Sequence, residues 1–251
     1  MDEVTILRRA YPFQDMTAAE LEPLLSSFRR RPLKREEAVW NQGDRANELW
    51  FVLSGQVRGI VTGEGGSEVV TGVFGPGESF GEIGLFMTDQ TRWASCVASV
   101  PSLVLSLPRE PLLRFLEAHP PALRRMLESL SRMAWMQSMA FREVAFRDIR
   151  GRIAWRLLDL AQRHGEPIDG GTRITLKLSQ ATLAGMVAAS RENVSRAMAA
   201  FTMAGDIRRQ AGQIIVVNAE ALRTAAGSHE AWPWPGPADG QGSVIPRRSR
   251  P

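Results

Sequence analysis

The sequence has little of what metal centres and disulfide frameworks require. Cys96 is the single cysteine among 251 residues. This excludes an internal disulfide, and also a zinc or iron–sulfur site with four thiolates from one chain. The three histidines, His119, His164 and His229, are far apart and lack metal-ligand spacing, and no partner ligand for a haem is visible. We therefore expect no metal, no haem and no iron–sulfur cluster.

Long apolar runs are also missing. No stretch reaches the about eighteen apolar residues of a membrane span, and the N-terminus lacks the basic-then-apolar order of a signal peptide. We expect a cytoplasmic protein without a membrane partner. The length and the 44% content of hydrophobic residues favour two domains. The net charge of +4 is compatible with an anionic partner.

The first half of the chain changes its hydrophobic period several times. Thr17 and Glu20 form a capping-box pattern and predict a short helix. Between residues 32 and 108, short β-rich runs alternate with turn residues, which predicts an antiparallel barrel or sandwich. The Pro120-Pro121 pair then predicts the start of a long helix that runs to about residue 145.

That helix carries an apolar stripe with heptad spacing. Its members are Leu123, Leu130, Gln137 and Val144 in one series and Leu127, Ala134 and Phe141 in the other. Two interpretations are equally compatible with the spacing: the stripe packs on the chain's own barrel, or it forms a dimer seam. Gln137 is the polar exception and would need a partner if it were buried.

A second helical domain follows. The segment 179–207 predicts two short helices joined by a turn, with Ser179 and Ser190 as N-caps. The run "GDIRRQAGQIIVV" predicts a two-stranded wing that turns at Ala211-Gly212. This is the arrangement of a winged helix-turn-helix, whose second helix enters the major groove.

Three side chains of that second helix point away from its apolar face. Arg191, Glu192 and Arg196 fall within an arc of roughly 140° at 100° per residue. Arginine reads guanine bidentately, and glutamate accepts from the cytosine amino group. An ordinary solvated face with an Arg/Glu pair has the same composition, but the neighbouring turn and wing favour DNA reading.

With these segments, "SRENVSR" at 190–196 and "DIRGRIAWRLLDLA" at 148–161, the chain resembles the Crp/Fnr superfamily of transcription regulators, and in particular the cyclic AMP receptor protein branch. The resemblance covers residues 10–225. It implies that Arg191, Glu192 and Arg196 read a TGTGA-type half-site. The turn before the second helix usually carries glycine where this chain has Ala188, a replacement that costs about 1 kcal/mol if the residue is left-handed.

The resemblance also assigns a ligand site to "GPGESFGEIGLFMTDQTRWAS", residues 75–95. In the family, backbone N–H groups of a Gly-Glu-Leu/Ile-Gly turn and a later arginine hold a cyclic phosphate, and the glutamate binds the ribose 2′-hydroxyl. The matching residues are Gly81, Glu82, Ile83 and Arg92. Independently, glycines and a helix N-terminus favour an anion. The alternative is a plain turn with a structural Glu82–Arg92 ion pair.

Two positions depart from the family pattern. Trp93 stands where a Ser or Thr hydroxyl meets the phosphate, and Gln137-Ser138 replaces the Thr-Ser pair that reaches the adenine, in part across the dimer. Ser138 is retained, and Gln137 is still a donor and an acceptor that could read a purine edge. The base preference is therefore open.

Together these features predict an α+β protein. Its parts are a cyclic-nucleotide-binding β-roll, jelly-roll-like, at 1–119, a dimerisation helix at 120–146, a winged helix-turn-helix at 147–226 and a disordered tail at 227–251. The expected function is a homodimeric regulator, not an enzyme, that binds double-stranded DNA under control of cyclic AMP, with RNA polymerase as a further candidate partner. The alternatives are another effector (cyclic GMP or a cyclic dinucleotide), no effector, or a regulatory module of an enzyme or scaffold.

Overall fold

The structure is a computed structural model that describes residues 3–14, 16–64 and 68–227. The chain divides into two compact units, Met1–Ser138 and Met139–Pro251. The tail from Ser228 onward, for which the sequence predicts disorder, lies outside the described residues. No helix in the described part combines the length and apolar composition that a bilayer span requires.

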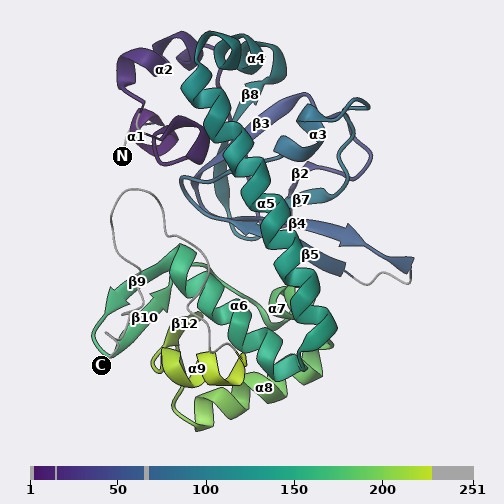
Figure 1. Ribbon diagram of the computed structural model, residues 1–251, viewed down its shortest axis with the longest axis vertical. Coiled ribbons are helices and arrows are strands. Elements are labelled where there is room, and N and C mark those ends of the chain that lie inside the picture. Colours follow the sequence, from purple (N-terminus) through teal and green to yellow (C-terminus); the bar gives the residue numbers. More distant parts are fainter. Residues whose placement is uncertain (1–2, 15, 65–67, 228–251) are drawn as a thin grey trace. The chain divides into compact units, whose positions relative to one another are not determined.

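The first unit consists of two antiparallel sheets and a set of helices (Figure 1). One sheet has the order β1-β8-β3-β6 and the other β2-β7-β4-β5. The strands are β1 (Arg29–Leu33), β2 (Ala38–Trp40), β3 (Glu48–Ser54), β4 (Val57–Thr62), β5 (Glu68–Phe74), β6 (Ser79–Phe80), β7 (Ser95–Ala98) and β8 (Ser102–Pro108). The helices are α1 (Glu3–Leu7), α2 (Ala18–Leu25), α3 (Glu82–Phe86), α4 (Arg109–Ala118) and α5 (Pro120–Phe146), with a 3-10 turn at Tyr11–Phe13.

Strand β3 explains how this unit holds its layers together. Because side chains alternate along a strand, Leu49 and Phe51 enter the core beneath the helices, whereas Trp50 and Val52 enter the core between the two sheets. All four are buried. A strand that is buried on both faces shows no polar alternation, and so "ELWFVLSG" is a nearly continuous apolar run.

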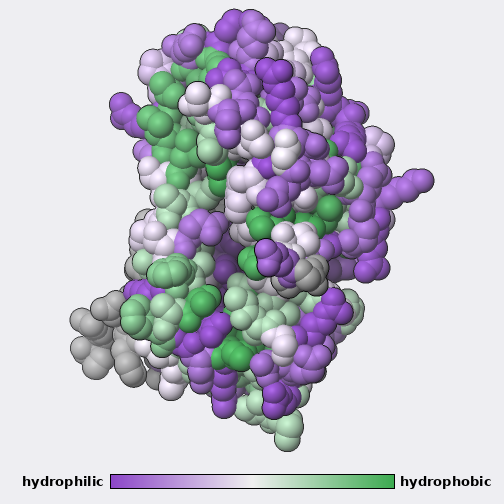
Figure 2. All heavy atoms as spheres, turned by 90° about the vertical axis from the view of Figure 1, so that its right-hand side faces the viewer, coloured by the Kyte–Doolittle hydropathy of each residue, from purple (hydrophilic) through white to green (hydrophobic). Residues whose placement is uncertain are grey.

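Helix α5 is 27 residues long and begins at the predicted Pro120-Pro121 pair. Ala122 and Met126 are buried in the core of the first unit. The heptad stripe lies on another side of the helix: Leu127 is 56% exposed and Phe141 76% exposed. The stripe therefore does not pack on the chain's own barrel. Hydrophobic patches also interrupt the mostly hydrophilic surface in Figure 2.

The second unit is a helical domain with a small sheet of order β11-β12-β10-β9. Helix α6 contributes to its core a buried face that includes Ile153, Leu157 and Leu160. The elements are α6 (Ile149–His164), β9 (Gly165–Ile168), β10 (Gly171–Ile174), α7 (Gln180–Val187), α8 (Arg191–Met203), β11 (Ile207–Gln210), β12 (Gln213–Val216) and α9 (Ala219–Ala225). The α+β fold and its long helix are thus as predicted.

Two turns of this unit have left-handed residues. Ala188, which ends α7, has φ 50° and ψ 56°. This is the left-handed conformation, in which alanine is less stable than glycine. Ala211 and Gly212, between β11 and β12, both have positive φ, as a two-residue hairpin turn requires. The wing turns where the sequence predicts it.

A buried ion cluster lies on α6. The Asp159 carboxylate accepts two hydrogen bonds of 3.1 Å from Arg163 and one of 3.1 Å from Arg156. Asp159 is 2% exposed. Burial acts to raise its pKa, but the two guanidinium groups outweigh burial and lower it.

Candidate functional site

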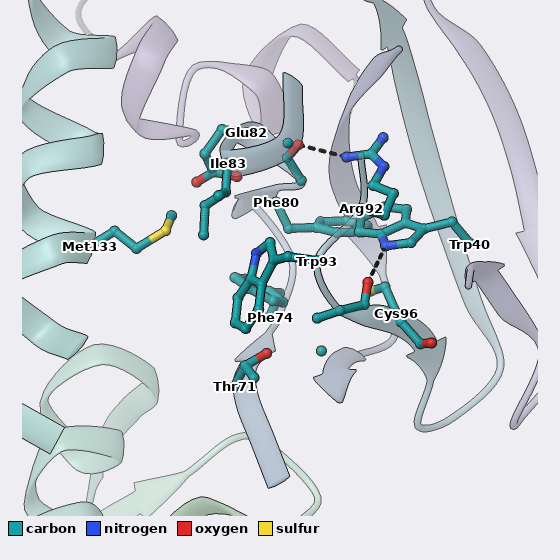
Figure 3. Close-up of a pocket in the computed structure, with 15 residues that line it drawn as sticks. Trp40, Thr71, Phe74, Phe80, Glu82, Ile83, Arg92, Trp93, Cys96 and Met133 are labelled. Carbon is teal, nitrogen blue, oxygen red and sulfur yellow. Dashed lines mark hydrogen bonds between the residues drawn. The ribbon is translucent and has the colours of Figure 1, made fainter. Parts of the chain in front are cut away.

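A pocket opens in the first unit where β2, β4, β5 and β6 meet the turn that leads into α3 (Figure 3). Met133 is the one residue of α5 in its lining. The lining comprises Trp40, Gly59, Thr71, Phe74, Phe80, Gly81, Glu82, Ile83, Gly84, Arg92, Trp93, Ala94, Ser95, Cys96 and Met133. The predicted residues Gly81, Glu82, Ile83, Arg92 and Trp93 are therefore brought together.

Gly81 precedes α3 with φ 93°, a conformation that favours glycine. A Cβ at this position would lie 2.7 Å from Arg92 Nη1 and 3.0 Å from the Trp40 ring. A Cβ on Gly84 would lie 2.4 Å from the Thr91 carbonyl oxygen. Close packing around the turn thus requires both glycines.

Arg92 is anchored under this turn by backbone carbonyls. Its Nη1 donates to Gly81 O at 2.6 Å and its Nη2 donates to Glu48 O at 2.7 Å, while its buried Nε has no partner among the described residues. Its guanidinium stacks 4.0 Å from the centroid of Trp40. Burial lowers the pKa of Arg92 to about 10, so the group is still a cation at neutral pH.

Glu82 lies close to Arg92 but does not pair with it. The side chain of Glu82 is 4% exposed, and no ion pair with Arg92 is found within the described residues. Burial raises the pKa of Glu82 to about 7, against the lowering effect of its own N–H group and of Arg92. The ion-pair alternative therefore does not hold: the pocket lining contains a cation and a carboxyl group that are not paired with each other.

An aromatic column fills much of the space beside Arg92. Phe74 stacks on Phe80 at 5.4 Å between centroids, and Phe80 stacks on Trp40 at 5.4 Å. Trp40 Nε1 donates to Ala94 O at 2.8 Å, which fixes its ring. The remaining cavity of about 70 Å³ is far below the roughly 300–1,000 Å³ of ordinary ligand pockets. The enclosed part of the pocket is therefore small.

Trp93 stands at the pocket mouth, 41% exposed, beside Ile83 and across from Met133 (Figure 3). Gln137 and Ser138 are not in the lining. Both are exposed, and the Ser138 hydroxyl donates to Ala134 O of its own helix at 3.0 Å. A single chain thus assembles the turn, the arginine and the tryptophan, but not the Gln-Ser pair.

The second unit positions the predicted DNA-reading residues on α8. Ser179 and Ser190 cap α7 and α8 by accepting hydrogen bonds from Thr182 N and Asn193 N, at 3.0 Å and 3.3 Å. Val194, Met198 and Phe201 are buried. Arg191, Glu192 and Arg196 are exposed, so the helix presents two cations and one carboxylate outward.

The sequence reasoning did not select several residues that the structure places at these sites. Trp40, Phe74 and Phe80 form the pocket interior, and the exposed Arg208 and Arg209 lie on strand β11 of the wing. Adjacent arginines on a predicted wing were a signal for phosphate contacts. Trp40, Phe74 and Phe80 lie on separate strands and gave no such signal in the sequence, because their proximity depends on how the strands pair.

The comparisons with known proteins agree for both units. Residues 30–119 match the cyclic nucleotide-binding domain and residues 151–225 match the Crp-like helix-turn-helix domain. The chain is 30% identical over 226 residues to the CRP-like cAMP-activated global transcriptional regulator of Mycobacterium tuberculosis, covering 90% of this chain and all of that one. It is 30% identical over 214 residues to the cyclic AMP receptor protein of Thermus thermophilus, covering 85% and 95%.

A solved structure extends the range of effectors among its relatives. The c-di-GMP responsive global regulator CLP of Xanthomonas campestris is 27% identical, with a TM-score of 0.66 and coverage of 80% of this chain and 99% of that one. The family models together span more than half of the chain. The predicted family is confirmed: this chain belongs to the Crp/Fnr family of DNA-binding transcription regulators, which are not enzymes, and it carries that family's cyclic nucleotide-binding domain.

Proposed function

We propose that this chain is a homodimeric regulator that binds a palindromic TGTGA-type operator when a cyclic nucleotide, cyclic AMP first, occupies the pocket of the first unit. The observation that carries the proposal is that Arg92 and Glu82 both line the pocket at the Gly81 turn without forming an ion pair with each other. A cyclic phosphate supplies an acceptor to Arg92, and a ribose hydroxyl supplies a donor to Glu82. Ile83 and Trp93 would flank the nucleotide.

The same proposal assigns Gln137 and Ser138 to the base and places them at the pocket of the second copy. Their exposure in a single chain supports this, because polar side chains beside an apolar stripe become enclosed when two stripes meet. The boundaries proposed for the parts are 1–119, 120–146, 147–226 and 227–251. Arg191, Glu192 and Arg196 would read bases, and Ser179 and Ser190 would face the phosphates.

Fluorescence anisotropy of a labelled TGTGA palindrome tests the proposal. Saturating cyclic AMP should tighten binding at fixed salt tenfold or more, which equals about 1.4 kcal/mol of coupling. Arg92→Gln should abolish the response but not the basal binding. Arg58→Gln is the matched control, because Arg58 pairs with Glu36 outside the pocket. Tight binding that ignores cyclic AMP would overturn the effector, and failure to bind in either condition would overturn the operator.

A second candidate keeps the DNA-binding role and changes the effector. Trp93 replaces a hydroxyl with an indole at the pocket mouth, which removes a hydrogen bond to the phosphate and adds bulk. A relative with a solved structure is c-di-GMP responsive. The same anisotropy titration with cyclic GMP and with cyclic di-GMP separates the two candidates, since the true effector produces the larger shift.

The dimer is tested on α5. Leu127→Glu inserts a charge into the apolar stripe and should convert a dimer into a 27.8 kDa monomer in sedimentation, because an unpaired buried carboxylate is too costly to retain. Arg124→Glu is the control, since Arg124 is exposed on the same helix outside the stripe. Unchanged sedimentation of Leu127→Glu would exclude this stripe as the seam.

A further inference from the structure

The side chain of Arg196 is not free in solution. Its Nη2 donates to Oδ1 of Asn193, three residues earlier on α8. Asn193 is half-buried, and its own N–H donates to the Ser190 cap at 3.3 Å. The backbone that carries this partner is therefore fixed at the first turn of the helix.

The chemistry of the two groups fixes how they meet. A guanidinium only donates, so the carboxamide of Asn193 must present its oxygen to Arg196 and direct its NH₂ group elsewhere. This hydrogen bond uses one of the five N–H groups of Arg196. Bidentate recognition of guanine O6 and N7 needs two, so Arg196 can keep its bond to Asn193 while it reads a base.

Glu192 is the obvious rival partner for Arg196, but within the described residues its carboxylate forms no ion pair with that guanidinium. Its own N–H and the Ser190 hydroxyl bond to it and lower its pKa, ahead of the weaker influence of Arg191 and Arg196. The Arg196 guanidinium is thus oriented by a neutral group, which leaves its full positive charge for DNA.

Helix α8 is itself tied to α7. Gln180 Nε2 donates to Ser195 Oγ at 3.3 Å, next to Arg196 in sequence. Arginine is a long side chain that loses rotamer entropy on binding, and a side chain that is ordered beforehand loses less.

We propose that Asn193 is a positioning residue that holds the guanidinium of Arg196 ready for base reading. The inference rests on the proposed function, in which Arg196 contacts a base of the half-site. Asn193 acts through Arg196, so its removal should matter only while Arg196 is present.

A double-mutant cycle on half-site discrimination tests this. Anisotropy is measured on the TGTGA palindrome and on variants with each guanine replaced symmetrically by adenine, for Asn193→Ala, Arg196→Ala and the double variant. Asn193→Ala should reduce discrimination about fivefold and should have no further effect on Arg196→Ala. Asn193→Asp retains the acceptor and should restore the discrimination ratio even if overall affinity falls. Thr202→Ala, at an exposed position of the same helix, is the control.

Equal losses from Asn193→Ala with and without Arg196, or no loss at all, would overturn the inference. A second readout needs no DNA: in the free full-length protein, NMR should show slower rotation of the Arg196 guanidinium than of the Arg191 guanidinium, and Asn193→Ala should abolish the difference. If the wild-type protein fails to discriminate half-sites but this difference is present, the operator proposal fails and the ordering of Arg196 stands. If the difference is absent in the wild type, the positioning role is wrong whatever the DNA result.

Discussion

Replacing Glu82 with glutamine should make the protein more stable at pH 8 by about 3 kcal/mol, with almost no effect near pH 4.5. Burial raises the pKa of this carboxyl from 4.5 to about 7 in the folded protein. A shift of this size corresponds to about 3 kcal/mol at 1.36 kcal/mol per pKa unit. Glutamine has the same shape and cannot ionise, so it removes the cost of a buried charge.

The direction follows from proton binding. Between pH 4.5 and about 7 the folded state binds more protons at Glu82 than the unfolded state does, so stability falls as the pH rises through this window. Urea titrations of the full chain at pH 4.5 and pH 8, followed by tryptophan fluorescence, measure the difference. Glu68→Gln is the control, because Glu68 is exposed on β5. Equal stability of Glu82→Gln and wild type at pH 8 would contradict the prediction.

Replacing Asp159 with alanine should destabilise the protein, and by more than Glu82→Gln stabilises it. Asp159→Ala leaves Arg156 and Arg163 without their shared carboxylate in a buried place, and breaking a buried ion cluster in this way typically costs about 3–5 kcal/mol. The melting temperature of the second unit should fall by roughly 15 °C or more, since 1 kcal/mol shifts a small domain by about 4–8 °C. Calorimetry of the full chain measures the loss.

The exposed Arg173–Glu166 pair provides the comparison for Asp159. Its side chains are 41% and 56% exposed, and exposed pairs contribute about 0–1 kcal/mol. Glu166→Ala should therefore leave the melting temperature nearly unchanged. Because the two arginines lower the pKa of Asp159, its contribution is complete above pH 3.8 and is lost as the pH falls through the lowered value. A loss for Asp159→Ala no larger than for Glu166→Ala would refute the cluster as a source of stability.

The two carboxyl groups differ in what burial does to the stability of the fold. Asp159 has two cations at hydrogen-bond distance and lowers the energy of the fold, whereas Glu82 has none and raises it. Strongly raised pKa values of this kind gather at functional sites. The expected gain in stability on removing Glu82 is thus the counterpart of its proposed role as the acceptor of a ribose hydroxyl.

Local signals in the sequence were sufficient for most of the fold. The Thr17–Glu20 capping box, the Ser179 and Ser190 caps and the turn at Ala211-Gly212 depend on residues within a few positions of one another, and all form as predicted. The start of α5 at Pro120 follows from the same kind of rule.

The interior of the pocket could not be predicted in this way. Arg92 bonds to the carbonyl of Glu48, 44 positions earlier in the chain, and Trp40 bonds to the carbonyl of Ala94, 54 positions away. The pairing of whole strands brings residues so far apart in sequence into contact. Because every residue type has the same backbone carbonyl, the sequence does not show which carbonyl accepts such a bond. The sequence therefore indicated which groups form the site but not that Arg92 is bound to carbonyls and stacked on a tryptophan.

The single cysteine gives the chain a built-in reporter. Cys96 is buried, lines the pocket and lies near Arg92, and burial raises the pKa of its thiol so that it stays protonated and unreactive. Thiol reagents therefore have one target in the chain, and because it is buried they reach it only when the surrounding structure opens. The rate of labelling by such a reagent therefore measures how often the structure around Cys96 opens, in the wild-type sequence and without any engineered probe.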